Sequence, residues 1–327
     1  MPLNLYALWD DGGYIDNIQG RGYMYLSWPL ILVLIDSIML SKSFQQFQLN
    51  DSTKLAFEEF KPAQTAKGRQ AAKPPIILSH GGGQTRYAWK KTGERLAAQG
   101  YYALAYDHRG HGDSEWSSDG FYNVELFAKD QAQVAASFDE KPILVGASLG
   151  GLSSMLVEGE LAPNTYRAIV LVDVTPTLNS SGADAIFSFM GEHVKEGFKT
   201  LDEAANIIAE YTGRPRQTDT SGLAKNLRLR DGRWYWHWDP NFIRIRERRE
   251  KGPERMIAAA KNIQCPIFLV RGKLSDLVKK EQIETFLTLV PHAKYIDVEE
   301  ARHMVAGDKN DIFTEALLAF IEEVSHV

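Results

Sequence analysis

The sequence predicts an α/β protein whose mainly parallel sheet is covered by helices on both faces. Apolar runs of four to six residues alternate with helix-compatible segments along most of the 327-residue chain. Runs that are apolar throughout are typical of strands buried on both faces of a parallel sheet. The alternation breaks once, between Val172 and Cys265, where the segment is too structured for a loop and too small for an independent domain. We therefore expect one α/β core with a helical lid inserted into it.

The composition is that of an ordinary soluble globular domain, with 44% apolar and 24% charged residues. A formal net charge of −5, without a basic stripe or a cysteine finger, argues against a nucleic-acid partner. The single cysteine, Cys265, excludes an intramolecular disulfide and any cysteine-built metal site. Because Cys265 opens an apolar run, we expect it to pack rather than to react.

Residues 1–45 differ in character from the rest of the chain. The stretch Tyr23–Leu40 is apolar, but Pro29 and Asp36 lie inside it. It is also at the short edge of the ~20 residues that a membrane-spanning helix needs. Acidic residues precede the stretch and no small-residue cleavage site follows it, which argues against a signal peptide.

Three interpretations of residues 1–45 stay open. They form an arm packed on the body or in a homodimer contact, or they attach the protein to a membrane through residues 23–40. Alternatively, they are an extended reading of a gene whose natural start is Met24 or Met39. We prefer the packed arm to membrane contact and expect a cytoplasmic protein, with peripheral membrane association as the alternative.

Strands of the core are expected where short apolar runs are bounded by turn residues. A hairpin comes first, at Phe47–Phe60, since two such runs flank the polar turn Asn50–Ser52. Further strands are expected at Pro75–Ser79, Tyr102–Tyr106, Ile143–Val145, Ala168–Val172, Ile267–Val270 and Lys294–Val298.

Helices are expected where apolar residues recur at helical spacing. In the core they are Tyr87–Gln99, Tyr122–Ser137, Leu152–Glu160 and Asp311–Val324. In the insertion they are Ala183–Glu196, Leu201–Tyr211 and Phe242–Arg249. This assigns residues 46–176 and 263–327 to the core and residues 177–262 to the lid.

A nucleophile elbow is predicted at Gly146-Ala-Ser148-Leu-Gly150, between an apolar strand and a helix. The turn at such a serine is tight, and glycines two residues to either side let strand and helix approach closely. The elbow would expose the Ser148 hydroxyl and point the Leu149 N–H at the same place. Taken alone, the motif also fits a glycine-rich turn whose serine caps the helix.

Together with this elbow, three further stretches resemble the α/β-hydrolase family. They are Gly81-Gly-Gly-Gln-Thr-Arg86, Asp107-His-Arg-Gly-His-Gly-Asp-Ser114 and His303-Met-Val-Ala-Gly-Asp308. They look like the lidded serine-esterase and cofactor-free haloperoxidase-like branch of the family. The resemblance covers roughly residues 47–325 and implies a sheet of the eight-stranded type with a catalytic triad in the order Ser, acid, His.

His303 is the expected base, since it lies between the last strand and the closing helix, in a loop that can swing over the sheet edge. Its imidazole titrates near neutral pH and suits proton exchange with serine. Asp276, just after a strand, is the expected acid, which would hold the imidazole in the required tautomer. Asp173 ends the preceding strand and is the alternative, because some members of the family take their acid from there.

An oxyanion hole requires two N–H donors near the developing negative oxygen. The elbow supplies Leu149. The second donor should come from the glycine-rich loop after the strand that ends at Ser79, and we expect Gly82, with Gly81 and Gly83 left open.

Substrate-pocket candidates are Trp234, Trp236 and Trp238 in the lid and Trp89 in the core, with packing inside the lid as the other interpretation of the first three. The loop 107–114 carries two aspartates and two histidines, but we interpret it as a tight turn that supports the site rather than as a metal site.

We expect a serine hydrolase that cleaves carboxylic esters of small to medium apolar substrates through an acyl-enzyme, without a metal or an organic cofactor. Lactone, carbon–carbon or peroxide chemistry on the same triad stays open. A ligand-binding sensor on a hydrolase scaffold is the non-enzymatic alternative. Ser148 argues against epoxide and haloalkane hydrolysis, for which this fold places aspartate at the nucleophile position.

Overall fold

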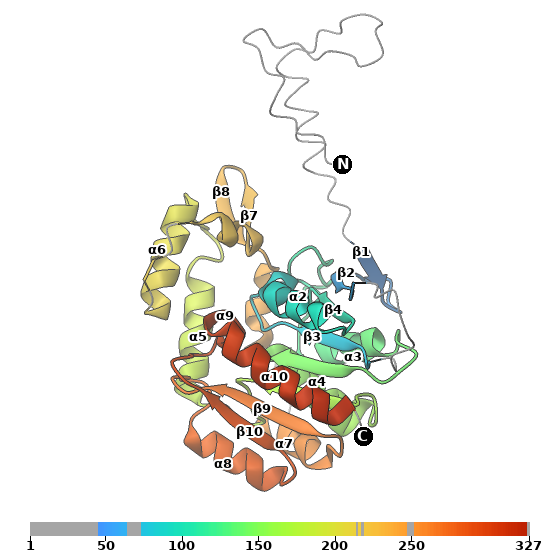
Figure 1. Cartoon of the computed structure of the whole chain (residues 1–327). Coiled ribbons are helices and arrows are strands. Elements are labelled where there is room, and N and C mark those ends of the chain that lie inside the picture. The colour runs from blue at the N-terminus through green and yellow to red at the C-terminus, as the bar shows by residue number, and fades with distance from the viewer. Residues whose placement is uncertain (1–44, 64–72, 214, 217–218, 247–251, 326–327) are drawn as a thin grey trace, which may run out of the picture. The chain divides into compact units, whose positions relative to one another are not determined.

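The computed structural model describes residues 45–63, 73–213, 215–216, 219–246 and 252–325 (Figure 1). The chain divides into two units, Met1–Phe44 and Gln45–Val327, so the predictions for the N-terminal segment lie outside the described residues. Within the described ranges, no helix is both long and apolar enough to cross a membrane.

An eight-stranded sheet forms the centre of the described unit, and it confirms the predicted mainly parallel α/β fold. The strand order is β1-β2-β4-β3-β5-β6-β9-β10. All neighbouring pairs from β4 to β10 are parallel, whereas β2 pairs antiparallel with β1 and β4. The strands are β1 (Gln45–Gln48), β2 (Lys54–Phe60), β3 (Ile76–Ser79), β4 (Ala103–Tyr106), β5 (Ile143–Ala147), β6 (Ala168–Val172), β9 (Ile267–Gly272) and β10 (Lys294–Val298).

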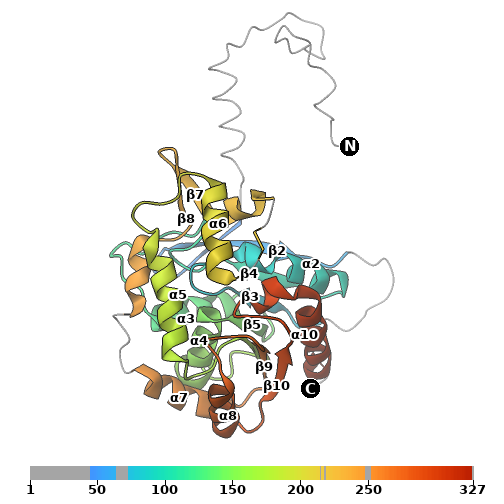
Figure 2. The same ribbon diagram turned by 90° about the vertical axis from the view of Figure 1, so that its left-hand side faces the viewer.

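Helices cover both faces of this sheet (Figures 1 and 2). One face carries η2 (Arg86–Trp89), α2 (Lys90–Ala98), α9 (Val305–Asp308) and α10 (Asn310–Ser325). The other carries α3 (Val124–Ala135), α4 (Leu149–Leu156), the π-helical turn η3 (Val157–Leu161), α7 (Gly252–Asn262) and α8 (Lys280–Leu289).

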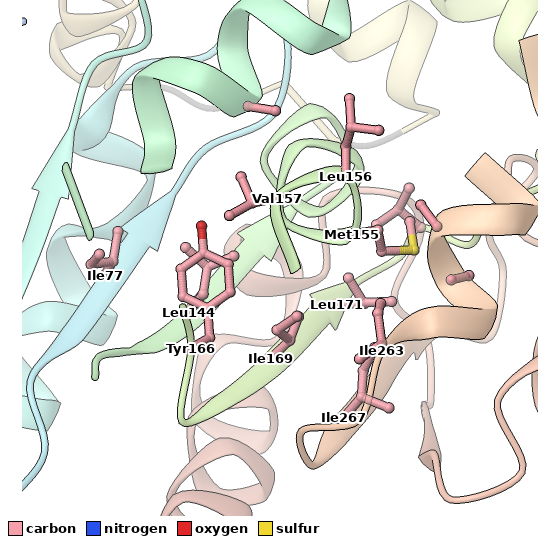
Figure 3. Close-up of a cluster of buried hydrophobic side chains, with 14 of the residues drawn as sticks. Ile77, Leu144, Met155, Leu156, Val157, Tyr166, Ile169, Leu171, Ile263 and Ile267 are labelled. Carbon is pink, nitrogen blue, oxygen red and sulfur yellow. The ribbon is translucent and has the colours of Figure 1, made fainter. Parts of the chain in front are cut away.

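Two buried apolar clusters result, because successive strand residues point to opposite faces. Ile77 packs with Leu144 and Ile169 beneath α4, as Figure 3 shows, whereas Ile76 and Leu78 belong to the cluster beneath α10. The strands are therefore buried on both sides, which explains their uninterrupted apolar sequences.

In the described residues, the insertion between β6 and α7 contains two α-helices, two 3-10 segments and a hairpin. They are α5 (Ser180–Glu192), α6 (Leu201–Thr212), the 3-10 turn η4 (Ser221–Lys225), β7 (Leu227–Arg230), β8 (Arg233–Trp236) and the 3-10 helix η5 (Pro240–Arg246). The structure thus gives 3-10 geometry where a helix over Phe242–Arg249 was expected, and residues 247–249 lie outside the description.

The predicted lid interval, 177–262, ends in α7, and this helix packs on the sheet. Ala259 and Ala260 are buried in the same cluster as α4 residues, and a Cβ at Gly159 would lie 1.9 Å from the Ala259 carbonyl oxygen. The part of the insertion that departs from the sheet therefore ends before α7.

The insertion is tied to the core by backbone hydrogen bonds. Gly112 donates to the His237 carbonyl (2.7 Å) and Asp239 donates to the Gly110 carbonyl (2.7 Å). On the other side, Asn179 donates to the Leu277 carbonyl (2.9 Å) and its side chain caps α5. The insertion is thus fixed over the carboxyl ends of the strands, where ligands bind in parallel sheets.

Gly150 is expected to tolerate no side chain, because a Cβ there would lie 2.5 Å from the Ser79 carbonyl oxygen of β3. We predict that Gly150→Ala lowers the free energy of unfolding by at least about 2 kcal/mol, through backbone displacement at the β5–α4 turn. Urea denaturation followed by circular dichroism measures it.

Gly191→Ala is the matched control, since Gly191 lies in the exposed last turn of α5 and a Cβ there would have nothing within 4 Å. It should change the free energy of unfolding by less than about 1 kcal/mol. Equal effects of the two substitutions would contradict the close β3–α4 approach.

Candidate active site

The loops after β3, β5, β6, β9 and β10 meet at one edge of the sheet, because parallel strands end on the same side. These loops carry most of the residues that the sequence singled out.

Ser148 occupies the strained turn that the elbow motif predicts. It is the N-cap of α4, with φ +45° and ψ −109°, a conformation that residues other than glycine rarely adopt. Its N–H donates to the Val172 carbonyl of β6 (3.2 Å), which holds the turn in place, and its side chain is partly exposed. A Cβ at Gly81 would lie 3.3 Å from the Ser148 Cβ, so the loop after β3 lies directly beside the serine.

His303 is hydrogen-bonded to Asp173. Its Nδ1 donates to Asp173 Oδ2 at 2.7 Å, and a quarter of its side chain is exposed. Asp173 is fully buried and accepts two more hydrogen bonds, from the Gly272 N–H (3.0 Å) and from the Ser275 hydroxyl (2.6 Å). These three donors compensate for the burial of a carboxylate and fix the orientation of the imidazole.

Asp276, the expected partner of His303, does not occupy that position. It is exposed, four residues beyond the end of β9, and its carbonyl lies against Gly182 of α5. The contact with His303 is made instead by the alternative candidate, Asp173, since β6 lies between β5 and β9 in the sheet. In the sequence, both aspartates follow a predicted strand within a few residues, so this pattern could not show which of them contacts His303.

Ser148 and His303 line one cavity of about 780 Å³. Among the described residues no hydrogen bond joins their side chains directly.

In the loop after β3, the N–H group of Gly82 differs from those of its two neighbours, which both have acceptors. The Gly81 N–H donates to Gln84 Oε1 (2.9 Å) and the Gly83 N–H donates to His111 Nε2 (3.1 Å). Within the described part of the chain, the N–H groups of Gly82 and Leu149 have no acceptor. Both residues line the cavity with Ser148, as two oxyanion donors would have to.

Loop 107–114 supports this arrangement. His111 is fully buried, and burial lowers its pKa to about 4, so the ring is neutral near pH 7. Its Nδ1–H donates to the Arg109 carbonyl (3.0 Å), which leaves Nε2 to accept from Gly83. The Asp107 carboxylate accepts from the Arg86 N–H (2.6 Å) and pairs with the Arg86 guanidinium. The loop after β4 thus holds the middle and the end of the glycine-rich loop after β3.

Three of the four tryptophan candidates line the cavity, namely Trp89, Trp236 and Trp238. Trp234 does not; its backbone pairs with Phe198, and its ring packs in a small cluster inside the insertion. Sequence reasoning missed the apolar residues of α4 and α5 in the lining, because helical periodicity marks a buried face without showing what it faces. Over the described residues, no group of three or more His, Cys, Asp or Glu is arranged to hold a metal ion.

A model of the alpha/beta hydrolase family matches residues 76–316, which include Ser148, Asp173 and His303. The chain belongs to the alpha/beta hydrolase family. This confirms the resemblance seen in the sequence, and the protein is a hydrolase enzyme.

Relatives of this hydrolase include esterases. An esterase of Mycobacterium tuberculosis is 29% identical over 249 residues, covering 72% of this chain and 78% of that protein. A 3-hydroxybutyrate-oligomer hydrolase of Cupriavidus necator is 26% identical over 243 residues, covering 70% and 82%. The crystal structure of E-2-(acetamidomethylene)succinate hydrolase has the same fold, with a TM-score of 0.72 and 22% identity over 85% of this chain and 99% of that one.

The His303–Asp173 hydrogen bond of this hydrolase predicts a downfield imidazole proton in its NMR spectrum. We expect the His303 Nδ1–H resonance to stay in place in Asp276→Asn and to move far upfield in Asp173→Asn, because only the latter replaces the charged acceptor. The measurement uses protein labelled with ¹⁵N-histidine. A resonance that moves in Asp276→Asn alone would contradict the contact.

Proposed function

We propose that this hydrolase cleaves carboxylic esters with Ser148 as nucleophile, His303 as general base and Asp173 as the acid that orients His303. The hydrogen bond between His303 and the buried carboxylate of Asp173 carries the proposal. It holds the imidazole with Nδ1 as donor, so that Nε2 is left to accept a proton in the cavity that also contains Ser148.

In the first half-reaction, the Ser148 oxygen attacks the ester carbonyl and its proton passes to His303 Nε2. The N–H groups of Gly82 and Leu149 donate to the oxygen that becomes negative. The tetrahedral intermediate collapses as His303 returns the proton to the leaving alkoxide, giving the alcohol and an acyl-enzyme. In the second half, water attacks the acyl carbon as His303 takes its proton. The tetrahedral intermediate then collapses as His303 gives this proton to the Ser148 oxygen, which releases the free acid and restores the serine hydroxyl.

An ester-type small molecule is the substrate class that the site favours. The cavity wall is mainly apolar, and its polar groups converge at Ser148, His303 and the glycine-rich loop. The similarity to an esterase and to an oligoester hydrolase supports the same class. The α5–η5 part of the insertion, from which Met190, Trp238 and Phe242 reach the cavity, would act as the lid that covers the substrate.

Ser148→Ala is predicted to abolish hydrolysis of p-nitrophenyl esters, with kcat falling by about 10⁶-fold because no nucleophile remains. Ser153→Ala is the matched control on the same helix: its hydroxyl is buried without a partner among the described residues, so its loss should leave kcat within about threefold. Turnover that survives in Ser148→Ala would refute the assignment of the nucleophile.

Kinetic measurements distinguish which of the two aspartates orients His303. Asp173→Asn should lower kcat by about 10⁴-fold, since a neutral amide stabilises neither the required tautomer nor the imidazolium. Asp276→Asn, at an exposed residue, should change kcat by less than about fivefold. The reverse ranking, measured with p-nitrophenyl acetate, would make Asp276 the acid.

A further inference from the structure

The cavity extends from Ser148 along one side of α4. Leu149, Leu152 and Leu156 all line it, and their spacing places them on one face of the helix. With a rise of 1.5 Å per residue, the eight steps from Ser148 to Leu156 correspond to about 12 Å along the helix axis. The side of the cavity formed by α4 is therefore long and continuous.

This side is apolar, and its residues are buried or partly buried. Next to the serine, Leu149 clusters with Ile186 and Met190 of α5. Further along, Leu152 and Met256 pack against the core cluster that contains Leu156. We call this part of the cavity, lined by these six residues, the α4 channel. Leu149, Leu156 and Met190 are buried, whereas Leu152, Ile186 and Met256 are partly exposed, so a chain lying there would contact apolar groups along its length.

Charged groups line the cavity at the end of the α4 channel. Arg255, next to Met256 at the start of α7, donates to Glu125 of α3 (2.8 Å) and to Glu160 (3.0 Å). Both Arg255 and Glu125 line the cavity. A hydrocarbon chain long enough to reach this pair would remove water from ionised groups, which costs free energy. This cost sets an upper limit to the length of the chain.

The part of the cavity beside His303 is exposed to solvent. Tyr211 of α6 is 42% exposed and Met304, next to His303, is 39% exposed. Asp276 and Arg302, which also line the cavity, are exposed as well. In the proposed reaction His303 protonates the leaving alcohol, so the alcohol has to lie on this side. The acyl group of the substrate then extends the other way, along α4.

We propose that the α4 channel is an acyl-chain site and that the preferred substrates are esters of linear medium-chain carboxylic acids. A saturated chain advances about 1.25 Å per carbon, from ~1.5 Å bonds at ~111°, so the channel holds about eight to ten carbons. The alcohol part is selected weakly, since it faces solvent. This inference rests on the proposed esterase function. It adds the class of carboxylic acid in the substrate and the residues that limit the length of the acyl chain.

Wild-type hydrolysis of p-nitrophenyl esters from acetate to palmitate tests the length. We expect kcat/KM to rise about three- to fourfold per methylene up to about eight or ten carbons, as each methylene leaves water, and then to fall. An optimum at acetate or butyrate, or activity that continues to rise to palmitate, would overturn the acyl-chain site while leaving the esterase proposal intact.

Substitutions inside the α4 channel test its position. Leu152→Trp should block it, lowering kcat/KM for the decanoate about 100-fold relative to the acetate. Met256→Ala should open its far end and move the optimum two or more carbons higher. Leu229→Trp, at an exposed residue of β7 that does not line the cavity, is the matched control and should leave the chain-length profile unchanged. Unchanged profiles in both channel variants would show that the acyl chain lies elsewhere.

Failure of the proposed esterase function can be distinguished from failure of the acyl-chain site. If the wild type hydrolyses no ester of the series, the esterase assignment fails. The channel is then tested alone by isothermal titration calorimetry, in which Ser148→Ala is titrated with the carboxylates from butanoate to hexadecanoate. Tightest binding at eight to ten carbons, weakened by adding Leu152→Trp, would support it. Binding that does not depend on chain length would overturn it.

Discussion

The buried carboxylate of Asp173 is the constraint on which the site depends. Its oxygens accept hydrogen bonds from the Gly272 N–H at the end of β9, from Ser275 in the following loop, and from His303 after β10. A carboxylate without exposure is tolerated only when its lone pairs are used, and here three donors from two loops use them. The same contacts that make burial of the charge tolerable therefore set the position of the imidazole.

A second set of contacts fixes the other side of the site. The loop after β4 supports the loop after β3, with neutral His111 accepting from Gly83 and Asp107 holding Arg86. Because these groups are buried, they hold the Gly82 N–H in place without competition from water. Ser148 lies between two loops that are each held by residues at a neighbouring strand end, so the placement of these loops beside Ser148 depends on contacts between strands.

The insertion gives the fold its particular cavity. Its ends are tied to the core at Gly110, Gly112 and Leu277, while α5 brings Met190 to the side of α4. The α4 helix thereby has two roles: its first residue, Leu149, supplies a backbone donor beside the serine, and its apolar face continues as a wall of the cavity. In our proposal this couples the reacting centre to recognition of the acyl chain through one rigid element.

The sequence by itself determined the parallel α/β core, the elbow at Ser148 and the position of His303, because each of these is encoded locally. Strands buried on both faces must be apolar throughout, and the β5–α4 turn must lack side chains where Gly146 and Gly150 meet neighbouring backbone. The tertiary structure decided which of Asp173 and Asp276 is hydrogen-bonded to His303, and which glycine N–H of the loop after β3 has no acceptor among the described residues. Those choices depend on strand order and on partners such as His111 and Gln84, and a pattern read along the chain carries no information on which strand ends lie side by side.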